Sequence, residues 1–126
     1  MALFDHLEKG GKSVKIVSLA DLPERRVSHN PEIEKKVMLE AGDLPHVTNF
    51  SQATFGPGQS ASPHAHADMV EVFFVEAGAG TIRVDGESHP LEMGTCVAVF
   101  PGEVHEVLNT GSTELVLTYF GVEVGG

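Results

Sequence analysis

The 126-residue sequence predicts an all-β protein, a sandwich or jelly-roll barrel closed on itself. Its 14 glycines and 7 prolines recur at short intervals and separate runs rich in Val, Phe, Thr and Leu, a pattern typical of short strands joined by tight turns. No stretch has sustained helical periodicity. The length suits a single domain, and a hydrophobic content of 41% excludes disorder.

Strands are expected where apolar runs lie between turn residues, at residues 36–39, 47–55, 61–67, 70–76, 81–84, 88–92, 95–100, 105–109 and 114–120. Asp85 and Gly86 stand between two of these runs, and an Asp-Gly pair in that position is the strongest short-range signal for a β-hairpin. Evidence for helix is confined to residues 31–36, where Asn30 as an N-cap favours one helical turn.

The cations are distributed unevenly along the chain. Seven of the eight Lys and Arg residues precede Val37, and from there to the C-terminus Arg83 is the only one, against twelve carboxylates. We therefore expect residues 1–35 to form an N-terminal arm outside the main body and residues 36–126 to form the β-domain. Sites for sugar phosphates or nucleotide sugars need several cations, so a neutral or singly charged substrate is expected.

Charge and cysteine content restrict partners and location. A formal net charge of -10 disfavours phosphate backbones and anionic lipid surfaces, so we expect neither a nucleic-acid nor a membrane partner. Cys96 is the only cysteine, which rules out an intramolecular disulfide, and its apolar surroundings predict a buried side chain. The first ten residues lack the apolar run of a signal peptide, and no run approaches the roughly 20 apolar residues of a membrane helix. The sequence thus predicts a soluble, cytoplasmic protein.

The segment from Val70 to Val75 is apolar on both faces if it is a strand. One face would carry Val70, Val72 and Phe74 and the other Phe73 and Val75, and both must be shielded from water. The barrel interior accounts for one face only. The other face must meet a second sheet, the N-terminal arm or a partner subunit. The two apolar faces and the detached N-terminal arm together predict a homodimer.

Four potential metal donors stand in the predicted β-domain: His64, His66, Glu71 and His105. His64 and His66 are two residues apart, so on an extended chain both imidazoles leave the same face. Glu71 is five residues beyond His66, an odd offset that points it away unless the chain bends near Ala67 and Asp68. His105 comes from a separate strand and completes the set.

The spacing of these residues resembles that of the cupin superfamily. Gly58, five residues, His64, one residue, His66, four residues, Glu71, six residues and Gly78 match the first cupin motif at every fixed position. The second motif is matched by Gly94, five residues, Phe100, one residue, Gly102, two residues, His105, three residues and Asn109. Phe100 stands where the family usually has proline, although Pro101 follows at once.

The resemblance implies a small single-domain cupin, a double-stranded β-helix or jelly-roll barrel that holds one divalent metal on His64, His66, Glu71 and His105. Three nitrogen donors and one oxygen donor suit several transition metals. Six-coordinate Fe or Mn is favoured because two coordination positions stay open, whereas four ligands already fill a tetrahedral Zn; Ni, Co and Cu remain alternatives. A hydrogen-bonded core cluster without metal is the non-functional alternative.

We expect a metal-dependent enzyme of the dioxygenase, decarboxylase or isomerase type that acts on a small oxygenated molecule, with Glu71 as catalytic residue shifting between ligand and proton acceptor. Pocket candidates are Gln52, Phe73, Arg83 and Phe100. A metal-containing binding or sensing module without turnover is the alternative function.

Overall fold

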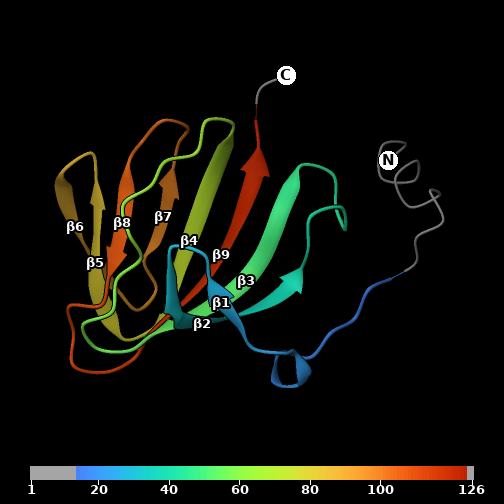
Figure 1. Cartoon of the computed structure of the whole chain (residues 1–126), viewed down its shortest axis with the longest axis horizontal. Coiled ribbons are helices and arrows are strands. Elements are labelled where there is room, and N and C mark those ends of the chain that lie inside the picture. Colours follow the sequence, from blue (N-terminus) through green and yellow to red (C-terminus); the bar gives the residue numbers. More distant parts are fainter. Residues whose placement is uncertain (1–13, 125–126) are drawn as a thin grey trace.

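The computed structural model describes residues 14–124 and contains nine strands and one short 3-10 helix in that range (Figure 1). The elements are η1 (Leu19–Asp21), β1 (Arg25–Val27), β2 (Asn30–Leu39), β3 (Val47–Phe55), β4 (Met69–Ala77), β5 (Ala79–Val84), β6 (Glu87–Glu92), β7 (Cys96–Val99), β8 (His105–Leu108) and β9 (Leu115–Glu123). The all-β prediction is confirmed. No helix in the described range is long and apolar enough to cross a membrane.

The strands form two antiparallel sheets with the core between them. One sheet has the order β1-β2-β3-β9-β4-β7 and the other the order β6-β5-β8. Residues that alternate along each strand point inward, and the most deeply buried apolar side chains come from both sheets: Ile33, Val75, Ile82, Leu91, Leu115 and Leu117. This is the expected β-sandwich of the jelly-roll type.

Residues 25–39 differ from the sequence-based expectation. Residues 31–36 are extended within β2 instead of forming a helical turn, because β2 pairs with β1 on one side and with β3 on the other. The expected boundary between residues 35 and 36 therefore falls inside β2, and residues 25–35 belong to the larger sheet. Residues 1–13 of the expected arm lie outside the described residues. Local propensity favoured a helix, and long-range pairing overrides it.

Residues 61–67 do not form the expected strand. They run beside β8 and pair with it at one isolated bridge, His64 with His105. Pro63 has no N–H to donate, so a continuous ladder cannot form across this stretch. The segment remains extended, which keeps the two-residue alternation of His64 and His66.

Two further expectations concern single residues. Asp85 and Gly86 join β5 to β6 with φ of 49° and 83°, the conformation of a type I′ hairpin turn, as predicted. Cys96, by contrast, is exposed, because β7 is an edge strand and Cys96 lies on its outward face.

Candidate metal centre

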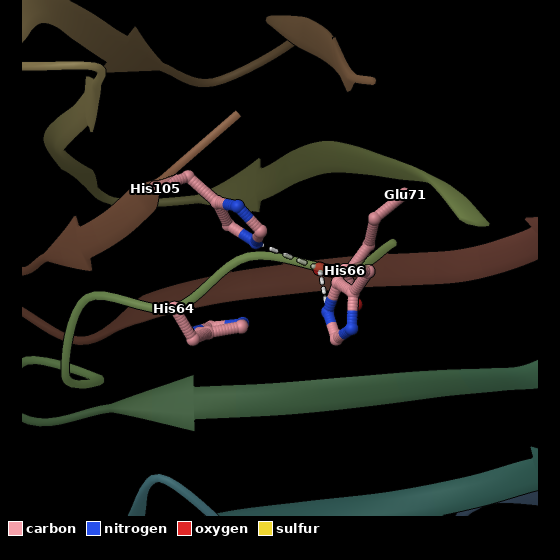
Figure 2. A group of neighbouring side chains, drawn as sticks. All are labelled: His64, His66, Glu71 and His105. Atoms are coloured by element: carbon pink, nitrogen blue, oxygen red, sulfur yellow. Dashed lines mark hydrogen bonds and ion pairs between the residues drawn. The ribbon is translucent and has the colours of Figure 1, made fainter. Parts of the chain in front are cut away.

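The donor atoms of His64, His66, Glu71 and His105 lie within 4.8 Å of one another (Figure 2). The two residues His64 and His66 come from the extended segment before β4, Glu71 from β4, and His105 from the first position of β8. The structure thus brings together the four residues that the sequence singled out, and this group could hold a metal ion.

The backbone around the group explains how the four side chains converge. The chain bends at Ala67 and Asp68, as the odd offset between His66 and Glu71 required. His64 and His105 exchange two backbone hydrogen bonds, of 3.0 Å from His64 N to His105 O and 2.8 Å in the reverse direction. These bonds attach the His64 segment to β8 and set the distance between the two imidazoles.

A turn at residues 100–103 positions His66. Pro101 precedes Gly102, whose φ of 84° fits the third position of a type II turn, and the N–H of Gly102 donates to the carbonyl of His66 at 2.8 Å. The backbone N–H of Phe100 donates to Oε1 of Glu103 at 2.8 Å. Proline, which the cupin motif usually has at position 100, has no N–H to donate. Phe100 therefore makes a hydrogen bond that the usual residue cannot make.

Backbone carbonyls determine the tautomers of two imidazoles. Nδ1 of His64 lies 2.9 Å from the carbonyl oxygen of Ser62, and Nδ1 of His105 lies 3.1 Å from that of Glu103. A carbonyl only accepts, so each Nδ1 carries the proton and donates. In a neutral ring Nε2 then has a free lone pair, which is the arrangement found in metal-ligating histidines.

The carboxylate of Glu71 faces two of these nitrogens. Its Oε1 lies 3.0 Å from Nε2 of His105 and 3.5 Å from Nε2 of His66 (Figure 2, dashed lines). The second nitrogen is buried and makes no hydrogen bond within the described residues. An unpaired buried polar atom costs about 1–3 kcal/mol. A cation among these acceptors would satisfy it, so the residues present fit a metal ion.

The pKa values of His64 and His105, the two imidazoles that donate to carbonyls, shift in opposite directions. Burial lowers the pKa of His64, and the hydrogen bond to Ser62 only partly opposes this. Burial also lowers the pKa of His105, but the hydrogen bonds to Glu71 and Glu103 outweigh it, so this pKa is raised overall. Desolvation raises the pKa of Tyr119 to about 12, and the negative charge of Glu71 adds to the effect, so its phenol is neutral at physiological pH.

A cavity of about 290 Å³ opens beside the group. Its walls are largely apolar, with Phe55, Phe73 and Leu117 among them, and they include His64, His66 and Glu71. His105 does not line it, and this residue is only 2% exposed.

Three of the four pocket candidates lie elsewhere. Phe73 is in the lining, whereas Gln52, Arg83 and Phe100 are not. Gln52 faces outward and donates to Oε2 of Glu76 at 2.6 Å. Arg83 lies 3.4 Å from Glu106 on the smaller sheet, and Phe100 is 58% exposed. The direction in which each points depends on strand register, which the sequence alone does not reveal.

Lys35 and His29 are among the residues of the cavity wall that were not predicted from the sequence. Both precede the expected boundary at residue 36. The ring of His29 stacks on that of His64, with centroids 3.8 Å apart and an interplanar angle of 15°. Lys35 stands two residues from each of the apolar residues Ile33 and Val37. This spacing is the sequence pattern that places Lys35 on the inward face of a strand.

Comparison with known proteins agrees with this architecture. The family model for the cupin domain matches residues 51–121. An oxalate-binding protein of Thermotoga maritima is 30% identical over 66 residues, which make up 52% of this chain and 54% of that protein, so the match spans about half the length of that relative.

Solved structures are similar in fold. A predicted oxalate decarboxylase of Thermotoga maritima superposes with a TM-score of 0.81 at 22% identity, covering 87% of this chain and 100% of that one. KdgF of a Halomonas species gives a TM-score of 0.74 at 19% identity, covering 88% and 96% of the two chains. The family model spans more than half of the sequence, and both motifs lie within the residues that it matches. The chain therefore belongs to the cupin domain family.

Proposed function

We propose that His64, His66, Glu71 and His105 hold one divalent transition metal per chain. The orphaned Nε2 of His66 is the observation that carries this proposal, because a buried imidazole nitrogen with no hydrogen-bonding partner among the described residues is best satisfied by a cation. The set of three nitrogens and one oxygen favours Fe or Mn, which keep positions open for a ligand, over Zn, Ni, Co or Cu.

We infer that this centre belongs to an enzyme acting on a small oxygenated molecule, in a reaction of the decarboxylase, dioxygenase or isomerase type. When bound, such an ion supplies Lewis-acid polarisation of an oxygen atom or one-electron chemistry. The apolar walls at Phe73 and Leu117 exclude water from the reacting molecule.

Glu71 is the residue proposed to move a proton. Both of its contacts with imidazoles go through Oε1, so Oε2 is available to accept a proton from a molecule in the cavity. The phenol of Tyr119, also in the cavity wall, stays neutral and offers a hydrogen-bond donor. This assigns proton acceptance to Glu71 and hydrogen-bond donation to Tyr119.

The relatives support a small acid as the molecule bound. One is named an oxalate-binding protein and another a predicted oxalate decarboxylase. The name of the oxalate-binding relative favours the alternative function, a metal-containing module that binds a small molecule without turnover.

We also propose that a second copy of this chain covers the outer face of the larger sheet. An apolar row of cross-strand neighbours crosses that face. It consists of Phe50 on β3, Phe120 on β9, Val72 on β4 and Ala98 on β7. Phe74 lies on the same face of β4 and is 43% exposed.

Metal analysis followed by a turnover assay tests the function. Protein purified without added metal is analysed for transition metals, then reconstituted with Mn(II) or Fe(II) and assayed for CO₂ release and oxygen uptake with oxalate and 2-oxo acids. We expect stoichiometric metal, and turnover that chelation abolishes. Glu71→Gln should lose turnover, whereas His89→Gln, an exposed histidine on β6, should behave as wild type. A wild type that binds no metal would disprove the proposal, and tight binding of oxalate without product would establish the binding module instead.

A further inference from the structure

Lys35 points into the cavity beside the candidate metal centre. It lines the cavity, and on β2 it alternates with Ile33 and Val37, which are 0% and 9% exposed. Its cross-strand neighbour on β3 is Ala53, which is buried and also lines the cavity. The side chain therefore lies on the inward face of the larger sheet, where charged residues are uncommon.

This ammonium has no protein partner in the described part of the chain. Every Lys or Arg ion pair found there belongs to Lys15, Arg25, Arg26 or Arg83. Asn49 of the same wall is already hydrogen-bonded, since it donates to Thr48 at 3.2 Å and accepts from Ser51 at 2.8 Å. Lys35 is thus a cation in the wall whose three donors are unused by residues 14–124.

The charges of the wall indicate what it would bind. Lys35 is the one Lys or Arg among the lining residues, and Glu71 is the one carboxylate. A divalent ion on neutral imidazoles and Glu71 leaves one positive charge uncompensated, and Lys35 adds a second. In a largely apolar cavity such charge is costly without a counterion, so the cavity suits an anion.

We propose that Lys35 is the specificity-determining residue of this site and binds a carboxylate group of a small acid whose other oxygens face the metal centre. The proposal rests on the proposed metal function and names its substrate class, a dicarboxylate or similar acid. It replaces the expectation of a neutral or singly charged substrate, which rested on Arg83 as the only cation of residues 37–126.

The adjacent Lys36 provides a matched control. It follows Lys35 on the same strand, so its side chain leaves the opposite face. Its Nζ donates to the carbonyl of Leu19 at 3.1 Å, outside the cavity wall. Replacing either lysine removes the same charge from the same strand, but only one replacement changes the cavity.

The test is isothermal titration of Mn(II)-loaded protein with oxalate, malonate and succinate, and with the monoamide of each acid. We expect the wild type to bind at least one dicarboxylate about 10- to 100-fold more tightly than its monoamide, the range of a charged hydrogen bond. Lys35→Met and Lys35→Gln should lose this preference, Lys35→Arg should keep most of it, and Lys36→Met should keep all of it. Metal content should be equal in all of these proteins, because Lys35 is not a ligand.

Two results would overturn the inference: a wild type without preference for any dicarboxylate, or an undiminished preference in Lys35→Met and Lys35→Gln. Circular dichroism checks that both variants fold.

If the wild type takes up no metal, the proposed metal function fails, and the same titrations are made on the metal-free protein. A preference that depends on Lys35 there would sustain the anion site, and its absence would overturn it.

Discussion

Nε2 of His105 lies 3.0 Å from Oε1 of Glu71, and both side chains are buried. This contact joins β8 to β4, two strands of different sheets. Because Nδ1 of His105 already donates to Glu103, a proton or a cation has to lie between the two atoms. The metal-free protein therefore uses a proton where the loaded protein would use a metal.

This relationship predicts opposite pH dependences for stability and for metal uptake. The pKa of His105 is raised above its usual value of about 6.5, so its protonated pair with Glu71 stabilises the metal-free protein below that pH. The stabilisation is lost as the pH rises through the raised pKa. Metal binding must displace the same proton, so metal affinity falls as the pH drops through the raised pKa.

Thermal unfolding and calorimetry check both signs. Unfolding of metal-free wild type and His105→Gln is compared from about pH 6 to pH 9, so that the difference isolates this imidazole. The difference should shrink toward high pH, while the affinity for Mn(II) should grow. A stability difference that is constant or grows with pH would contradict the prediction.

Replacement of Gly78 by alanine should strongly destabilise the fold. Gly78 has a φ of 81°, and a Cβ there would approach the backbone of Glu114 more closely than the 3.0 Å that real Cβ atoms respect. Gly86 has a similar φ of 83° with no atom within 4 Å, so Gly86→Ala isolates the conformational cost. We expect about 1 kcal/mol for Gly86→Ala and at least about 3 kcal/mol for Gly78→Ala in urea unfolding. Equal losses would mean that the backbone at Glu114 adjusts freely.

Asn109 should be essential for the fold although it lies away from the metal donors. Its Nδ2 donates to the carbonyls of Phe55 and Thr113 at 2.9 and 2.8 Å, and its Oδ1 accepts from the N–H of Gly111 at 2.9 Å. Asn109→Leu leaves these groups unpaired, at about 1–3 kcal/mol for each buried one. We expect a loss of about 3 kcal/mol or more in chemical unfolding.

Thr110→Val is the control for Asn109, because it removes only an exposed hydrogen bond of 3.0 Å to Thr81. Its stability should stay within about 0.5 kcal/mol of the wild type. An Asn109→Leu protein as stable as this control would show that water replaces the lost contacts.

A charge on the outer face of the larger sheet should disrupt the proposed dimer. Phe74→Asp places a carboxylate in the apolar row, where burial against a second copy would cost several kcal/mol. Met93→Asp, at a residue 74% exposed outside the strands, is the control. Sedimentation velocity at micromolar concentration should give dimers for wild type and Met93→Asp and monomers for Phe74→Asp. A monomeric wild type would refute the second copy as the cover of this face.

Three of the metal donors were predictable because they lie on a short stretch of chain, and His105 was predicted from the resemblance to the second cupin motif. The alternation of His64 and His66 places two rings on one side, and the odd offset of Glu71 demands the bend that the structure has at Ala67 and Asp68. The Asp85–Gly86 turn followed in the same way from local φ preferences. Each of these features depends on a few consecutive residues.

The cavity wall was not predictable, since it depends on which strands pair and in which register. Lys35 looked like part of a basic arm, and only its pairing opposite Ala53 turns it toward the cavity. Gln52 and Arg83 had suitable chemistry but leave their strands on other faces. A shift of one residue reverses every side chain of a strand, so the short alternation of Ile33, Lys35 and Val37 did not outweigh the helical interpretation of residues 31–36.

Local order along the chain therefore predicted the short strands, the tight turns and three of the four donors, because these depend on near neighbours, whereas His105 was predicted from the spacing of the second cupin motif. The shape and charge of the cavity were decided by the assembled sheets, because pairing between distant strands sets the direction of each side chain. Lys35 is the clearest case: its charge is evident from the sequence, but its position in the same cavity wall as Glu71 exists only in the folded molecule.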